Sequence, residues 1–259
     1  MTNYIIRRVM IIPILMAGIS MLIFAMLSLL TPYERAALYV TDIPKRQGAI
    51  EGIIEKYGLD DPIYVQYWRW MVGQKDEDTG EVTGGVLRGD LGWSKVGKST
   101  VAEVIARRLP ATAELAIWSA IPLIGLAVWM GIKAAVNHDK FVDQILRLAA
   151  IAGWSIPTFV FGLLLLLKFY SDLDLFPPGR LSIGMNEFIQ SDAFIQYTKL
   201  HTLDALLNLR FDVFKDTIRH LVLPVVTLSV VSWAFLLRVT RSSMLDTLRQ
   251  DYITTARAK

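Results

Sequence analysis

The sequence predicts an all-α integral membrane protein with four membrane-spanning helices. Three observations predict this fold class. Hydrophobic residues make up 53% of the 259 residues, above the roughly 45–50% of soluble domains. They gather in four blocks, and a hydrocarbon core of ~30 Å takes about 20 helical residues to cross. The charges that flank these blocks alternate in sign along the chain.

The four apolar blocks place the expected membrane helices at residues 9–30, 113–135, 146–170 and 221–237. The first block follows Arg7 and Arg8, but it is too long for the apolar part of a signal peptide and no small-residue cleavage site follows it. We therefore expect it to be retained. Four prolines fall inside or at the ends of the blocks, at positions 13, 122, 157 and 224. Packed membrane helices tolerate proline, because neighbouring helices satisfy the freed carbonyl.

Charge predicts the orientation of these helices. Net positive charge is found at the N-terminus, in the short connection 131–150 and in the tail from Arg238, whereas residues 32–111 and 171–219 are net negative. Because Lys and Arg favour the cytoplasmic side, we expect a cytoplasmic N-terminus and two extracytoplasmic loops, 32–111 and 171–219. Glu114 and Lys168 lie near the outer ends of their predicted helices, where both can extend to the interface. No mid-membrane carboxylate relay is apparent, so the energy for any transport is expected to come from outside this chain.

The stretch "GWSKVGKST" fits the phosphate-binding pattern G-x-x-x-x-G-K-[ST] from Gly92 to Ser99. A working phosphate-binding loop follows a buried strand, precedes a helix and needs an Asp on another strand to hold Mg²⁺. The preceding "GGVLRGDLG" is not an apolar strand, and the stretch lies in the first predicted extracytoplasmic loop. We interpret the match as a false positive, a Gly-rich surface turn in which Ser99 or Thr100 caps a helix.

Composition excludes several other function classes. The 27 basic and 24 acidic residues nearly balance, so nucleic-acid binding has little support. Cysteine is absent, which rules out disulfides and Cys-ligated metal sites, and the three histidines are far apart, which disfavours a His-based metal site. An intramembrane hydrolase would need a His or Asp near Ser119 or Ser155 in the sequence, and neither serine has one. We expect no enzyme activity in this chain. A non-transport membrane scaffold remains an alternative that would keep the helices.

The tail, residues 241–259, continues from the fourth apolar block with a different pattern. Its larger apolar residues form one stripe: Met244, Leu245, Leu248 and Tyr252. Small residues follow, and small side chains allow a partner protein to approach the backbone closely. The tail is therefore predicted to dock on a partner, which a scaffold would not require.

Taken in order, these segments resemble the permease subunit of ATP-binding-cassette (ABC) importers of the dipeptide, oligopeptide and nickel class. The resemblance covers nearly the whole chain. It is carried by "NYIIRR", "YGLDDPIYVQYWRWM", "LRGDLGWS", "VIARRLPATAELA", "GWSIPTFVFGLLLLLKFY" and most specifically "HLVLPVVTLSVVSWAFLLRVTRSSMLDTLRQDYITTARAK". Departures occur at residues 29–40, where the family usually has Pro-Gly-Asp-Pro, and at the acidic stretch 74–85.

This resemblance implies a type I importer and its partners. These are a second permease subunit, two ABC ATPase subunits, an extracytoplasmic solute-binding protein and the lipid bilayer, with no nucleic acid. ATP and Mg²⁺ would be bound by the ATPase subunits, so no cofactor is expected in this chain. The transported solute would be a peptide, with nickel or oligosaccharides as alternatives. The expected location is the inner (plasma) membrane.

The resemblance also assigns the coupling residues. The family pattern E-A-A-x-x-x-G falls on Thr254, Thr255 and Ala256, so Thr254 replaces the usual Glu. Together with Asp251, Tyr252 and Arg257, these residues are expected to begin a short cytoplasmic helix that docks on an ATPase subunit. The family continues beyond this point with the rest of the coupling loop and two more membrane helices. We therefore expect residues 1–259 to be a C-terminally incomplete permease domain.

Overall fold

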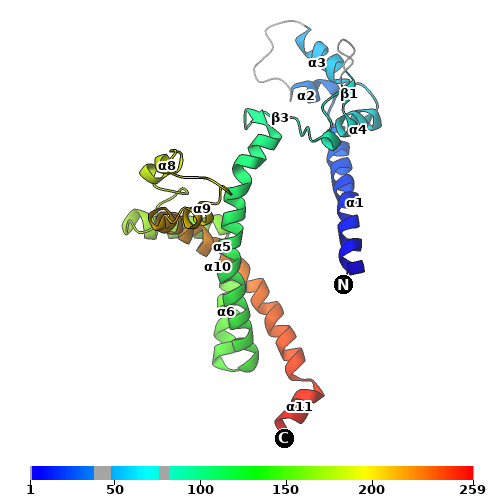
Figure 1. The fold of residues 1–259 in the computed structure, drawn as a ribbon. Coiled ribbons are helices and arrows are strands. Elements are labelled where there is room, and N and C mark those ends of the chain that lie inside the picture. The colour runs from blue at the N-terminus through cyan, green and yellow to red at the C-terminus, as the bar shows by residue number, and fades with distance from the viewer. Residues whose placement is uncertain (1, 38–47, 76–81, 259) are drawn as a thin grey trace. The chain divides into compact units, whose positions relative to one another are not determined.

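The computed structural model describes residues 2–37, 48–75 and 82–258 (Figure 1). The chain forms two compact units, Met1–Arg107 and Arg108–Lys259. Each unit is mainly helical, and α5 begins in the first and continues into the second.

The first unit joins one long helix to a group of short elements. Its helices and strands are α1 (Thr2–Leu27), α2 (Pro32–Ala37), α3 (Ala49–Tyr57), α4 (Ile63–Val72), β1 (Gln74–Lys75), β2 (Val82–Thr83), the 3₁₀ helix η1 (Val86–Arg88), β3 (Trp93–Ser94), β4 (Ser99–Thr100) and the first residues of α5 (Val101–Val136). The strands form two antiparallel pairs, β1 with β2 and β3 with β4. Most of the predicted loop 32–111 is therefore folded; residues 38–47 and 76–81 of it lie outside the described residues.

Local chemistry explains how α2 and α3 pack. Thr31 and Glu34 form a reciprocal cap: the Thr31 N–H donates to Glu34 Oε2 at 2.8 Å, and the Glu34 N–H donates to Thr31 Oγ1 at 3.3 Å. The Thr31 N–H holds the pKa of Glu34 below its ordinary value. Behind this cap, Ala36 of α2 packs against Ile54 of α3 and Leu59, and all three are buried. This small core fixes the elements that follow α1.

The second unit contains the remaining helices. After α5 come α6 (Phe141–Ser155), α7 (Thr158–Leu166), the π-helix η2 (Leu167–Asp172), α8 (Ile183–Ile189), α9 (His201–Leu207), α10 (Phe211–Leu248) and α11 (Asp251–Ala258). A buried cluster of Ile189, Phe194, Ala205 and Val213 holds α8 and α9 against the start of α10. The predicted loop 171–219 is thus partly helical, and its last residues belong to α10.

Length and composition make two described helices suitable for crossing a membrane, Asn3–Leu27 and Val101–Val136. Two bent pairs also qualify if each is counted as one span: Phe141–Ser155 with Thr158–Asp172, and Phe211–Val230 with Ser232–Leu248. All four overlap the predicted spans 9–30, 113–135, 146–170 and 221–237. That these helices cross a membrane stays a prediction.

The expectation that residues 146–170 form one helix is wrong. The chain turns by 94° between Phe141–Ser155 and Thr158–Asp172. Pro157 has no N–H and disfavours helical geometry at the residue before it. Ile156 is accordingly extended, with φ −93° and ψ 123°. Pro13, Pro122 and Pro224, in contrast, lie inside helices.

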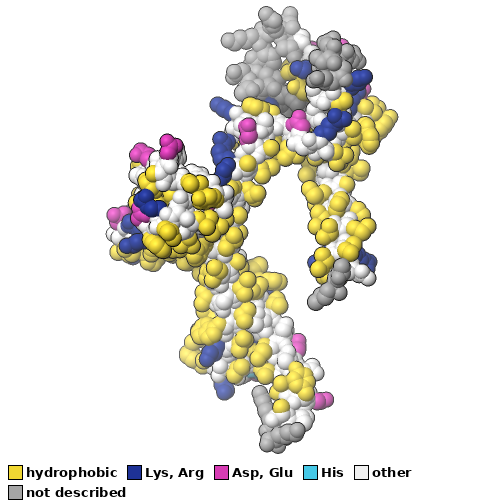
Figure 2. Space-filling model, viewed as in Figure 1, with side chains coloured by type: hydrophobic (Ala, Val, Ile, Leu, Met, Phe, Trp, Pro, Cys, Tyr) yellow, Lys and Arg dark blue, Asp and Glu magenta, His cyan; other side chains and the backbone are white. Residues whose placement is uncertain are grey.

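Helix α10 is the element against which the other long helices of the second unit pack. Glycines on three of them face it closely. A Cβ on Gly131 of α5 would lie 2.6 Å from the Thr240 Cβ, one on Gly153 of α6 would lie 3.3 Å from Trp233 Nε1, and one on Gly162 of α7 would lie 3.3 Å from the Thr227 Cγ2. Small residues at such positions let membrane helices approach closely. The outer faces are apolar, as Figure 2 shows for the visible sides of α5 and α6.

Candidate functional site

The six predicted coupling residues all lie on α11. Asp251 is its first residue, where a negative charge is favoured by the helix dipole. Tyr252 exposes 61% of its surface, and Thr255 and Ala256 are also exposed. The Thr255 hydroxyl donates to the Asp251 carbonyl oxygen at 2.8 Å within the helix. Thr254 and Arg257 contribute backbone to the same helix.

The sequence predicts a tail that continues straight from the fourth apolar block, and the structure confirms this only as far as Leu248. Helix α10 ends at Leu248, and two non-helical residues precede α11. The Arg249 N–H donates to the Leu245 carbonyl at 3.2 Å and the Gln250 N–H to the Thr247 carbonyl at 3.1 Å, which closes the end of α10. Helix α11 is therefore a separate short element, with the side chains of Tyr252, Thr255 and Ala256 on the surface.

An ion pair joins α6 to α10 upstream of α11. Arg241 donates from Nε to Asp143 Oδ1 and from Nη2 to Asp143 Oδ2, each at 2.7 Å. Asp143 is fully buried, whereas Arg241 exposes 18% of its side chain. From the sequence, both residues are only charges that flank predicted membrane helices. The acid in the first turn of α6 was the available signal, but its partner lies 98 residues away.

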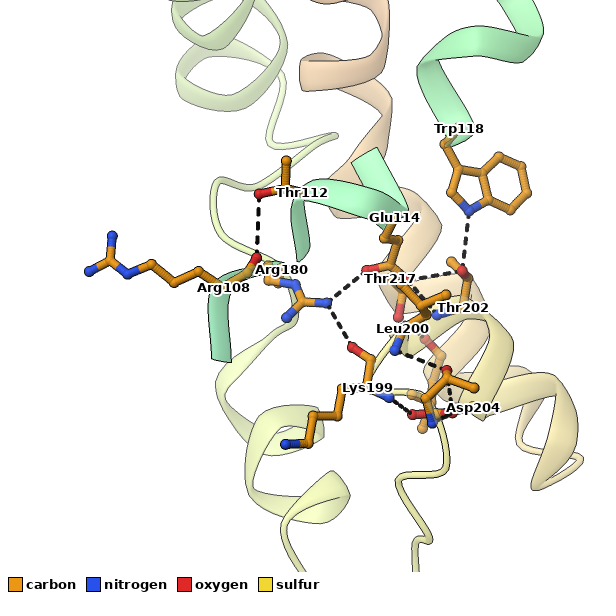
Figure 3. A network of polar contacts seen from close by, with 12 residues as sticks. Arg108, Thr112, Glu114, Trp118, Arg180, Lys199, Leu200, Thr202, Asp204 and Thr217 are labelled. Atoms are coloured by element: carbon orange, nitrogen blue, oxygen red, sulfur yellow. Dashed lines mark hydrogen bonds and ion pairs between the residues drawn. The ribbon is translucent and has the colours of Figure 1, made fainter. Parts of the chain in front are cut away.

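A second polar network lies in the part of the unit predicted to be extracytoplasmic (Figure 3). Glu114 of α5 is 2% exposed and accepts hydrogen bonds from the Thr202 N–H at 2.7 Å and the Thr202 hydroxyl at 2.9 Å. Arg180 Nη2 lies 2.8 Å from the other Glu114 oxygen. Trp118 Nε1 donates to the Thr202 hydroxyl at 3.2 Å. The expectation that Glu114 extends to the interface is wrong, because it is buried and paired. Lys168, by contrast, is exposed and pairs with Asp172.

The same network holds the turn before α9. Asp204, fully buried, accepts hydrogen bonds from the Thr198 N–H, the Thr198 hydroxyl and the Lys199 N–H at 2.8–2.9 Å. His201 is also buried, and its Nδ1 has no hydrogen-bond partner within the described part of the chain. Burial, and then the charge of Arg180, lower the pKa of His201. These contacts fix the folded segment between η2 and α10 onto α5.

The stretch "GWSKVGKST" forms a small β-hairpin. Trp93 pairs with Thr100 and Ser94 with Ser99, and the Gly97 N–H donates to the Ser94 hydroxyl at 3.0 Å. Lys98 has a positive φ of 49°. Thr100 caps α5, since its hydroxyl accepts from the Glu103 N–H at 3.2 Å.

Similarity to known proteins decides the class of this chain. Residues 124–259 match the family "Binding-protein-dependent transport system inner membrane component". Residues 1–116 match the family "Binding-prot-dependent transport system membrane comp, N-term". The chain belongs to this family of transport-system membrane components.

Individual relatives agree with the family. The oligopeptide transport system permease protein AppB of Bacillus subtilis (strain 168) is 37% identical over 261 residues, covering 100% of this chain and 70% of AppB. The probable D,D-dipeptide transport system permease protein DdpB of Escherichia coli (strain K12) is 32% identical, covering 95% of this chain and 66% of DdpB. The dipeptide transport system permease protein DppB of the same strain is 29% identical, covering 100% and 72%.

The permease is therefore a multi-pass inner-membrane subunit of an ATP-driven, binding-protein-dependent importer, with the all-α fold of type I importers. It is a permease and not an ATPase, and it works with partner subunits.

Proposed function

We propose that this permease forms part of the pathway of a peptide importer and that α11 couples it to an ATPase subunit. The similarity to permeases named for oligopeptides and dipeptides supports the solute class. The observation that carries the coupling role is the separate helix α11, which presents Tyr252 on the surface. Exposed aromatic side chains are frequent anchors of protein interfaces. Thr255 and Ala256 are small enough for a groove to approach the helix backbone.

The proposed assembly contains a second permease subunit, two ABC ATPase subunits and an extracytoplasmic solute-binding protein. ATP and Mg²⁺ bind to the ATPase subunits. The N-terminus, residues 131–150 and the tail from Arg238, which includes α11, lie in the cytoplasm, in line with the net positive charge of each of these segments. The apolar side chains that α1 exposes, such as Ile14 at 71% and Met16 at 66%, would face lipid or neighbouring helices.

The Gly92–Ser99 stretch does not bind a nucleotide in this proposal. Two features support this. A phosphate-binding loop wraps its backbone N–H groups around phosphates between a buried strand and a helix, whereas this stretch is a two-stranded hairpin with its own cross-strand register. The Gly97 N–H is also already engaged by Ser94.

The coupling role is tested in the complete transporter with Tyr252→Ala and Ala256→Arg. Uptake of a labelled dipeptide should fall by about tenfold or more, as expected when an interface anchor is lost, while peptide binding to the isolated solute-binding protein is unchanged. Tyr4→Ala is the matched control, because Tyr4 is 58% exposed on α1 near the cytoplasmic N-terminus. Normal uptake and ATPase stimulation in both α11 variants would remove the coupling role from this helix. Competition by nickel or oligosaccharide, and not by peptides, would reassign the solute.

A further inference from the structure

The ion pair between Asp143 and Arg241 is placed at the base of the proposed coupling element. Arg241 lies on the last part of α10, whose final residue is Leu248, and α11 begins at Asp251. Asp143 lies in the first turn of α6. Arg241 therefore links the end of α10 that leads to α11 with the first turn of α6.

Every hydrogen bond that the structure describes for the Asp143 carboxylate lies at this junction. Both oxygens accept from Arg241, and Oδ2 also accepts from the Asp139 N–H at 3.1 Å. Asp139 has φ 60° and belongs to the turn between α5 and α6. One buried carboxylate thus ties together the α5–α6 turn, the start of α6 and the end of α10.

Burying two charges is unfavourable unless the geometry is very good and the remaining lone pairs are satisfied. The bidentate contact meets this condition, because the planar guanidinium group fixes direction as well as distance. A lysine would supply the charge without the fork. The contact between Arg241 and Asp143 therefore fixes the relative orientation of α10 and α6, in addition to balancing the two charges.

The neighbouring packing makes the junction stiff. The Gly131 site on α5 touches Thr240, the residue before Arg241. Farther along α6, Gly153 lies against Trp233 of α10. Helix α6 is thus held to α10 near both ends, and it leads directly to the turn at Ile156 and Pro157.

We propose that Asp143 and Arg241 are positioning residues of the coupling reaction. They clamp α6 and the α5–α6 turn to α10. When the ATPase moves α11, these three elements then move together as one rigid body. The proposal rests on the proposed role of α11. In this proposal the pair transmits movement from α11 to α6 and takes no part in docking the ATPase.

The test uses the complete transporter in proteoliposomes, with its solute-binding protein and a saturating labelled dipeptide. Asp143→Asn and Arg241→Gln should each lower peptide imported per ATP hydrolysed by about tenfold, within the range of typical coupling between sites. ATPase co-purification and basal ATP hydrolysis should stay within about twofold of the unmodified transporter. The double variant should be no worse than either single one, since residues that act through one contact are not additive.

Arg147→Gln is the matched control. Arg147 Nε lies 3.8 Å from Asp143 Oδ1, and its side chain is 48% exposed, so its loss should leave the import ratio within about twofold, as for other exposed ion pairs. Arg241→Lys covers the case in which the neutral variants do not assemble, because it keeps the positive charge near Asp143. It should assemble, bind the ATPase and still lose several-fold in the import ratio, since it lacks the fork.

A normal import ratio in assembled Asp143→Asn and Arg241→Gln, or in Arg241→Lys where those do not assemble, would overturn the clamp. Tyr252→Ala is measured in parallel. If Tyr252→Ala uncouples transport and the Arg241 variants do not, only the clamp fails. If Tyr252→Ala and Ala256→Arg both leave transport unchanged, the proposed role of α11 fails, and the clamp fails with it.

Discussion

Gly131 offers the sharpest test of how the helices of this permease pack. A Cβ built there would lie 2.6 Å from the Thr240 Cβ, 2.8 Å from its Cγ2 and 3.1 Å from the Leu237 carbonyl oxygen. Distances below 3.0 Å between such atoms require something to move. The obstacles are a branched side chain close to its backbone and a backbone oxygen, neither of which yields easily. Gly131→Ala should therefore push α5 away from α10.

The same helix supplies a control for the intrinsic effect of alanine. Gly125 of α5 has nothing within 4 Å of its would-be Cβ, so Gly125→Ala only gains helix propensity, about 1 kcal/mol in water. Gly131→Ala gains the same amount but also suffers overpacking, which typically costs about 1–3 kcal/mol. Gly131→Ala should thus be less stable than Gly125→Ala by about 1–3 kcal/mol.

The measurement is unfolding of the purified permease in mixed micelles by titration with a denaturing detergent, followed by the fluorescence of its seven tryptophans. Adding Thr240→Gly should recover part of the loss in Gly131→Ala, because it removes both side-chain atoms that clash. The reasoning is refuted if Gly131→Ala is at least as stable as Gly125→Ala. It is also refuted if Thr240→Gly is equally harmful with and without Gly131→Ala.

Three further outcomes are expected. In the cysteine-free chain, Asp192→Cys should react with a membrane-impermeant thiol reagent in intact cells and Lys140→Cys only after the membrane is opened; the reverse pattern would invert the topology. Lys98→Ala should leave ATP hydrolysis by the assembled transporter essentially unchanged, and a collapse in an assembled variant would revive the nucleotide-site interpretation. Burial and Arg180 lower the pKa of His201, so the unfolded chain takes up this proton more readily. The contribution of neutral His201 to the free energy of unfolding is therefore fully present above the ordinary pKa of about 6.5 and is lost as pH falls below it. The unfolding midpoint should drop more between pH 7.5 and 5.5 in the unmodified protein than in His201→Gln, and equal drops would contradict this.

Much of the fold was predictable because it depends on local composition. The four apolar blocks, the charge alternation and the helix over Asp251–Arg257 follow from which residues stand close together in sequence. The break at Ile156 was also within reach. A tolerated proline at position 157 is the wrong prediction, because Pro157 imposes an extended backbone on Ile156 and ends α6.

The sequence by itself determined that this is an apolar, helical, charge-asymmetric membrane protein with a docking segment at its end. Only the tertiary structure decided which charges meet. Asp143 and Arg241 are 98 residues apart, and Glu114 and Thr202 are 88 apart. The sequence predicts only that Asp143 and Arg241 flank membrane helices and that Glu114 extends to the interface. No local pattern specifies such pairs, because their partners are chosen by helix packing, and the cost of burying a charge becomes visible only when the opposite helix is in place.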